Sequence, residues 1–123
     1  MGSRGVQTAL CWTRTAVGAG MWLAPGRSAR LFGLGPALDQ ADPALVGRLF
    51  GVRDIALAQA LRHPDPQLRR QALRLGVAVD TVDVVASLVA ALRGGRRSGL
   101  VGVGAGALLF ACTGLVALRD AER

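Results

Sequence analysis

The segment from residue 98 to residue 118 constrains the fold of this chain most, because its 21 residues carry no charge. A helix rises about 1.5 Å per residue, so a helix of this length spans the roughly 30 Å hydrocarbon core of a bilayer. Its sequence, SGLVGVGAGALLFACTGLVAL, lacks the polar face that a helix on the surface of a soluble protein needs. Its glycines would weaken a helix in water but are common in membrane helices, where small residues allow close packing. The segment is therefore expected to cross a membrane.

Three further apolar stretches precede this segment, and each contains ionisable residues. Two of them begin with helix-start signals, because Asp42-Pro43 and Asp65-Pro66 each place an N-capping acid before a first-turn proline. At 123 residues the chain is long enough for one domain. We therefore predict an all-α, four-helix transmembrane bundle that forms a single domain over residues 1–123, with helices at about 6–24, 43–62, 66–93 and 98–118.

Two other interpretations would also account for apolar stretches in this chain. A small soluble four-helix bundle with an unusually apolar surface would explain why three of the helices carry charges, but it does not explain the uncharged fourth. A cleaved signal peptide would explain the first stretch. However, Arg14 interrupts its apolar region and no clear A-x-A cleavage site follows. We expect the first segment to be retained as a helix.

Six ionisable residues lie away from the ends of the predicted helices. Each costs about 2.5–3.5 kcal/mol on insertion scales when it is placed at the centre of a spanning helix, so it needs either a partner or a function. Three of the six are basic and three are acidic, so the set is neutral. They are Arg14, Arg48, Arg53, Asp54, Asp80 and Asp83.

Residue counts along the helices predict which of these groups lie at the same depth. Counting from the turn between the second and third helices, and from the ends of the first and second, gives three level pairs: Arg53 with Asp80, Arg48 with Asp83, and Arg14 with Asp54. A neutral, depth-matched set is typical of a closed ion-pair network that fixes helix register. The alternative is a polar pathway between the helices. No proline interrupts a predicted span, although discontinuous helices are typical of transport sites.

The remaining composition excludes several classes of site. One histidine and two separated cysteines do not make a typical zinc or iron–sulfur centre, and two aspartates do not hold a metal without further oxygen ligands. We therefore predict no catalytic residue, no cofactor and no metal. The net charge of +7 comes with no basic stripe interleaved with aromatics, so we expect contact with anionic lipid rather than with nucleic acid. Cys11 and Cys112 fall at a similar depth, and whether they pair is left open.

Residues 48–57 read RLFGVRDIAL, and a later helix carries Asp80-x-x-Asp83. This combination resembles a family of small bacterial membrane proteins known only as a domain of unknown function. Residues 25–36 are similar to the stretch that follows the first helix in that family, so the resemblance covers most of the chain. The family often has a glycine after the leucine, where this chain has Ala58-Gln59. The resemblance implies a four-helix integral membrane protein and no particular activity.

The sequence thus predicts a non-enzymatic, multi-pass protein of the bacterial cell membrane. We expect it to act as a structural or interaction partner, with the lipid bilayer and either another membrane protein or a second copy as its partners. The alternative is a small carrier or proton-conducting protein that uses the intramembrane aspartates. An enzyme acting on lipid or quinone stands third. With both termini in the cytoplasm, our preferred orientation, the arginines divide six to five between the two sides.

Overall fold

The computed structural model describes residues 2–31, 43–94 and 97–123, and the regular structure in these ranges is entirely helical. The helices are α1 (Ser3–Leu23), α2 (Pro25–Leu31), α3 (Pro43–Ala60), α4 (Pro66–Leu92) and α5 (Arg97–Glu122). The prediction of an all-α chain is confirmed. The four long helices lie where the apolar stretches predicted them, with ends that differ by at most a few residues.

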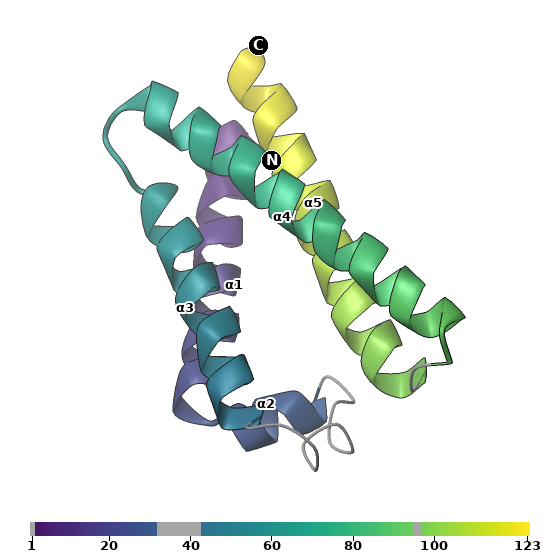
Figure 1. Cartoon of the computed structure of the whole chain (residues 1–123). Coiled ribbons are helices and arrows are strands. Elements are labelled where there is room, and N and C mark those ends of the chain that lie inside the picture. The colour runs from purple at the N-terminus through teal and green to yellow at the C-terminus, as the bar shows by residue number, and fades with distance from the viewer. Residues whose placement is uncertain (1, 32–42, 95–96) are drawn as a thin grey trace.

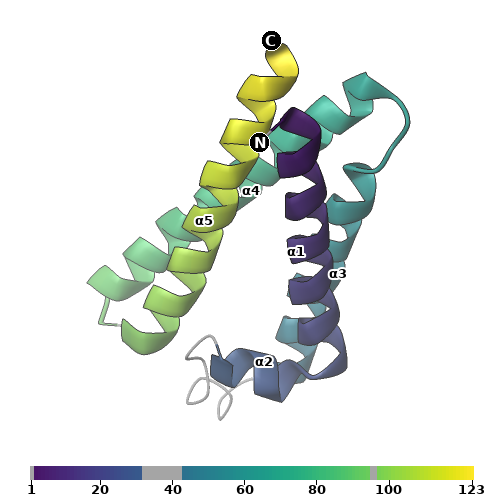
Figure 2. The same ribbon diagram turned by 180° about the vertical axis from the view of Figure 1, so that it is seen from behind.

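The four long helices are arranged as two antiparallel pairs. Helix α1 packs along α3, and α4 packs along α5 (Figure 1). The two pairs meet near the chain termini and diverge toward the end where α2 lies, as the reverse view also shows (Figure 2). The molecule is therefore V-shaped, and contact between the pairs is concentrated at its closed end.

The turn between the two pairs is built from the predicted capping signal. The side chain of Asp65 accepts a hydrogen bond of 2.8 Å from the backbone N–H of Gln67, and Pro66 occupies the first turn of α4. Arg69 donates to the carbonyl oxygens of His63 and Pro64, both at 2.8 Å. These bonds satisfy backbone groups of the turn, so the direction of the chain between α3 and α4 is well defined.

The fifth helix, α2, was not predicted. The sequence predicts no helix between residues 24 and 43, and this stretch is expected to lie along the membrane interface with Leu31, Phe32 and Leu34 in contact with lipid. The structure makes Pro25–Leu31 a helix because α1 ends at Leu23 and a proline can start a new helix at once. Leu31 is 86% exposed, whereas Phe32 and Leu34 lie outside the described residues.

Glycines allow α1 and α3 to approach closely. A Cβ added at Gly18 would lie 2.6 Å from the carbonyl oxygen of Gly51, and one added at Gly51 would lie 2.5 Å from the carbonyl oxygen of Gly18. Gly47 faces Pro25, which would lie 3.1 Å from an added Cβ. Gly47 and Gly51 therefore give α3 a face of small residues, and it packs against α1 and the start of α2.

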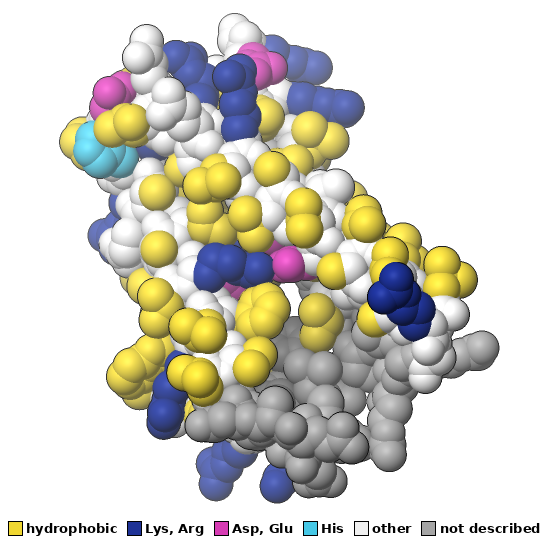
Figure 3. Space-filling model, in the orientation of Figure 1, with side chains coloured by type: hydrophobic (Ala, Val, Ile, Leu, Met, Phe, Trp, Pro, Cys, Tyr) yellow, Lys and Arg dark blue, Asp and Glu magenta, His cyan; other side chains and the backbone are white. Residues whose placement is uncertain are grey.

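The hydrophobic core is small and lies at the closed end of the V. It contains residues from all four long helices: Val6, Leu10, Cys11, Ala58, Leu61, Ala72, Leu73 and Ala117. Away from it, large apolar side chains face outward along the helices, and Figure 3 shows them covering the middle of one face. Within residues 2–31, 43–94 and 97–123, two helices, α4 and α5, are long and apolar enough to cross a membrane.

Candidate functional site: a buried arginine–aspartate network

The side chain of Arg14 connects the two helix pairs. Arg14 comes from α1 and is only 2% exposed. Its Nη1 donates to Oδ1 of Asp54 on α3 at 2.9 Å, and its Nη2 donates to Oδ2 of Asp80 on α4. The guanidinium also lies over the ring of Phe110 on α5, 4.5 Å from the ring centre. One side chain therefore contacts the other three long helices.

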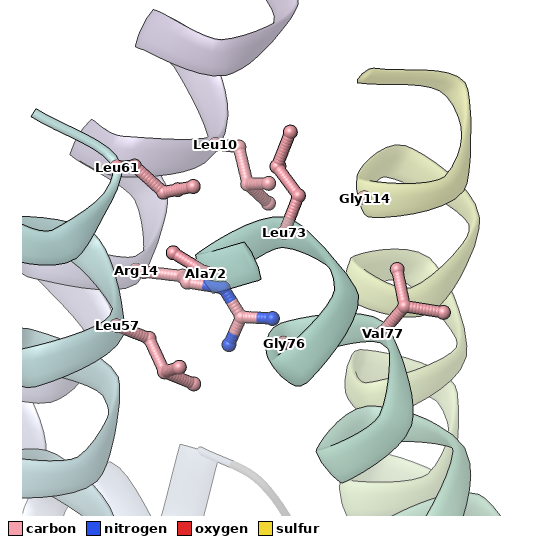
Figure 4. Close-up of a pocket in the computed structure, with 9 residues that line it drawn as sticks. All are labelled: Leu10, Arg14, Leu57, Leu61, Ala72, Leu73, Gly76, Val77 and Gly114. Carbon is pink, nitrogen blue, oxygen red and sulfur yellow. The ribbon is translucent and has the colours of Figure 1, made fainter. Parts of the chain in front are cut away.

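Small residues make room for this guanidinium. A Cβ added at Gly76 of α4 would lie 3.4 Å from Nη2 of Arg14. Figure 4 shows the Arg14 side chain reaching from α1 toward the turn of α4 that carries Gly76. The cavity beside it is about 10 Å³, which holds no more than one water molecule. This space is too small for a substrate, so the site around Arg14 is a packed junction.

A second ion pair adjoins the first. Nη1 of Arg53 donates to Oδ2 of Asp83 at 2.7 Å, and Nη2 of Arg53 lies 3.7 Å from Oδ1 of Asp54. The side chains of Arg53 and Asp83 are 30% and 19% exposed, so this pair is more open than the pairs of Arg14. The Arg53 guanidinium covers the ring of Phe50 at 4.7 Å, and its Nε is buried without a hydrogen-bond partner among the described residues.

Asp54 pairs with both Arg14 and Arg53, so these ion pairs form one connected group, which we call the Arg/Asp network. Five of the six residues singled out in the sequence belong to it: Arg14, Arg53, Asp54, Asp80 and Asp83. It joins helices α1, α3 and α4, which correspond to the first three predicted spans. The network holds three carboxylates and two guanidinium groups.

Arg48, the sixth residue, is not part of the network. It is exposed, its Nε donates to the carbonyl oxygen of Trp22 at 3.4 Å, and its guanidinium lies 5.7 Å from the centre of the Trp22 ring. The predicted pairing of Arg48 with Asp83 is wrong. Five residues separate Arg48 from Arg53, which turns their side chains about 140° apart around α3. Only one of the two can face α4.

The predicted pairing of Arg53 with Asp80 is also wrong. Asp80 binds Arg14 instead, and Arg53 binds Asp83. Counting residues from the turn gives equal depth only if the two helices run side by side, and α4 leans away from α3 (Figure 1). The pairing of Arg14 with Asp54 is confirmed, because α1 and α3 do pack along each other.

Two residues that sequence analysis did not assign to the site contribute to it. Phe110 covers the Arg14 guanidinium, and Gly76 provides the space beside it. Phe110 is the single aromatic residue of the uncharged segment 98–118, and that was a usable signal. Gly76 lies four residues before Asp80 on α4, but no sequence feature indicates its contact with Arg14.

The two cysteines take no part in the ion pairs of the Arg/Asp network. Both cysteines are free: Cys11 is buried and its Sγ donates to the carbonyl oxygen of Ala58 at 3.2 Å, whereas Cys112 is exposed. Among residues 2–31, 43–94 and 97–123, no three histidine, cysteine or acidic side chains form a group that could hold a metal ion. Comparisons of this chain with models of protein families, with curated proteins and with solved structures find no match.

Proposed function

We propose that this chain is a four-helix integral membrane protein without enzymatic activity, in which the Arg/Asp network fixes the relative positions of the helices. Its role is that of a structural or interaction partner within the bilayer. The observation that carries the proposal is the position of Arg14, fully buried among groups from three other helices. A buried charge with matched partners specifies one arrangement, because any other arrangement leaves charges without partners.

The exposed apolar surface supports the membrane location. In the most apolar 18-residue stretch of α4 only 11% is buried inside the protein, and in that of α5 only 17%. A core helix of a soluble protein would be mostly covered by its neighbours. Lipid is the covering that suits two long helices with outward-facing leucines and valines.

The ion pairs support the inclusion of α1 and α3 among the spans. These helices have 21 and 18 residues, which gives lengths of about 31 Å and 27 Å. Arg14 and Asp54 would each disfavour insertion alone, but they neutralise each other at 2.9 Å.

The orientation with both termini in the cytoplasm remains part of the proposal. Arg74 pairs with Glu122 near the end that carries the termini, and Arg48 contacts Trp22 near the opposite end. With Arg74 counted on the side of the termini and Arg48 on the opposite side, the arginines divide seven to six. This difference gives little weight to either orientation. Reporter fusions at each terminus are therefore needed to assign it.

Membrane fractionation and topology mapping test this proposal together. The full chain is expected to stay with the membrane after alkaline carbonate washing, and reporters at both termini are expected to be active on the cytoplasmic side. Release by carbonate, or termini on opposite sides, would contradict four spans. Purification in mild detergent should then recover either a second copy or a partner membrane protein. A strictly monomeric protein without a partner would contradict the interaction role.

A second candidate function is that of a small carrier or proton-conducting protein, favoured by one observation. The network contains one more carboxylate than guanidinium, and its outer pair, Arg53 and Asp83, is partly exposed. Proton flux into proteoliposomes distinguishes the two functions. Flux that is present in the wild type and lost in Asp83→Asn would favour conduction. The absence of proton flux from both would contradict proton conduction.

A further inference from the structure

A polar recess lies between the start of α4 and the end of α5. It has a volume of about 410 Å³ and is open to the outside. Four of its five lining residues come from the first turns of α4 and can donate hydrogen bonds; the fifth is acidic and comes from the end of α5. The lining residues are Gln67, Arg70, Gln71, Arg74 and Glu122.

The charges of this recess suit a phosphate group. Nη2 of Arg74 lies 3.1 Å from Oε1 of Glu122, so the charge of this arginine is compensated by an acidic group of the opposite helix. Arg70 has no ion pair or hydrogen bond from its side chain within the ranges that the structure describes. It is half-buried and one turn from Arg74 on the same side of α4. The amides of Gln67 and Gln71 flank it with further donors, so the recess offers one uncompensated guanidinium and neutral donors around it.

An apolar stripe continues from the recess along α4. Leu75, Val82 and Val89 follow Gln71 by four, eleven and eighteen residues, spacings that keep side chains on one face of a helix. Their exposed fractions are 57%, 65% and 42%. A polar group seated at Gln71 would therefore have an uncovered hydrocarbon surface directly below it. A recess with an unpaired basic group followed by an exposed apolar stripe matches an amphiphile that has an anionic head and acyl chains.

The end of the molecule around the recess is strongly basic. Figure 3 shows basic side chains gathered at the end that carries the C-terminus. The described residues there include seven arginines and three acids: Arg4, Arg62, Arg69, Arg70, Arg74, Arg119 and Arg123, with Asp65, Asp120 and Glu122. This excess favours a headgroup with net negative charge over a zwitterionic one.

We propose that the recess between α4 and α5 binds the headgroup of an anionic phospholipid, with the phosphate on Arg70, Gln67 and Gln71 and the acyl chains along Leu75, Val82 and Val89. The inference rests on the proposed membrane location, because the acyl chains need α4 to face lipid. In this geometry Arg74 and Glu122 fix the far wall of the recess, and Arg70 provides the charge that the ligand neutralises.

Native mass spectrometry of the full-length protein in detergent tests the assignment. The delipidated protein is titrated with phosphatidylglycerol or with phosphatidylcholine of the same acyl chains, and the lipid-bound fraction is measured. The wild type is expected to prefer phosphatidylglycerol, and Arg70→Gln to lose about fivefold in phosphatidylglycerol affinity, since one arginine near anionic lipid contributes about a fivefold factor. Arg62→Gln is the matched control, because it removes the same charge from the same end without lining the recess. Its affinity for phosphatidylglycerol should fall clearly less than that of Arg70→Gln.

Three outcomes would overturn the assignment. The first is equal binding of the two lipids by the wild type, and the second is equal losses in Arg70→Gln and Arg62→Gln. The third is complete displacement of phosphatidylglycerol by excess inorganic phosphate, which would assign the recess to a free anion. Carbonate washing of membranes is carried out on the same variants. Failure of the proposed membrane location appears there as release of the wild type, independently of any lipid preference.

Discussion

Replacing Arg14 by methionine is expected to destabilise the protein far more than the same replacement at Arg48. Methionine is apolar and nearly as long as arginine, so Arg14→Met keeps most of the volume but leaves Asp54 and Asp80 without their shared cation. Arg14 is 2% exposed and Asp80 is 1% exposed. Removing one partner of a pair buried to this degree costs about 3–5 kcal/mol. That is a large share of the roughly 5–15 kcal/mol by which a small domain is stable.

The control has the same chemistry without the burial. Arg48 is exposed, and its contacts are a 3.4 Å hydrogen bond to Trp22 and a ring contact at 5.7 Å. Arg48→Met is therefore expected to cost about 1 kcal/mol or less. Both free energies are measured by titrating the protein from mild detergent into sodium dodecyl sulfate and following helix content by circular dichroism. Equal losses in the two variants would refute the assignment of Arg14 as the buried link between the helix pairs.

A double-mutant cycle extends the test to the pair itself. Asp80→Asn alone should cost about 1.5–3 kcal/mol, because it removes a charge-assisted hydrogen bond. Combined with Arg14→Met, it should add clearly less than that amount, because the bond is already gone. For substitutions at residues that share no interaction, the losses in free energy of unfolding add within about 0.5 kcal/mol. Additive losses at Arg14 and Asp80 would therefore contradict their direct contact.

Two further predictions follow from the same geometry. The loss in free energy of unfolding caused by Asp83→Asn should be non-additive with that of Arg53→Gln and additive with that of Arg48→Gln. The reason is that Asp83 contacts Arg53 at 2.7 Å and makes no contact with Arg48 in the part of the chain that the structure describes. Detergent unfolding of the double variants measures both, and coupling of Asp83 to Arg48 would restore the pairing predicted from depth. Gly51→Ala should cost about 1–3 kcal/mol in the same assay, because the added Cβ would lie 2.5 Å from the backbone oxygen of Gly18, and an unchanged unfolding curve would contradict the close packing of α1 on α3.

Most of the secondary structure and one ion pair were predictable from the sequence. Helix positions follow from the lengths of apolar stretches and from signals such as Asp65-Pro66, which depend on neighbours in the chain alone. The pairing of Arg14 with Asp54 follows from depth because α1 and α3 lie side by side along their lengths. Residue counting gives depth along a helix, and for adjacent antiparallel helices depth is enough to predict a contact.

The other pairs depend on quantities that a residue count does not contain. Arg48 and Arg53 lie at neighbouring depths, but their direction around α3 decides which of them faces α4. The tilt of α4 away from α3 then brings Arg53 to Asp83 and leaves Asp80 to Arg14. The tilt of α4 is set by how it packs against the helices beside it, including the contact of Ser87 on α4 with Gly104 on α5. Such contacts are not visible in any one segment.

The position of Arg48 also changes the meaning of the charge balance. Six residues counted together are neutral, and neutrality was the reason to prefer a closed network. Because Arg48 is not part of the network, three carboxylates share two guanidinium groups. The pair of Arg53 and Asp83 is partly exposed, whereas Arg14 and Asp80 are buried. A structural role depends on the buried pair of Arg14 and Asp80, whereas a proton pathway needs an accessible pair such as Arg53 and Asp83. Variants at Arg14 and Asp83 therefore test the two functions separately: Arg14→Met reports on stability, and Asp83→Asn reports on flux.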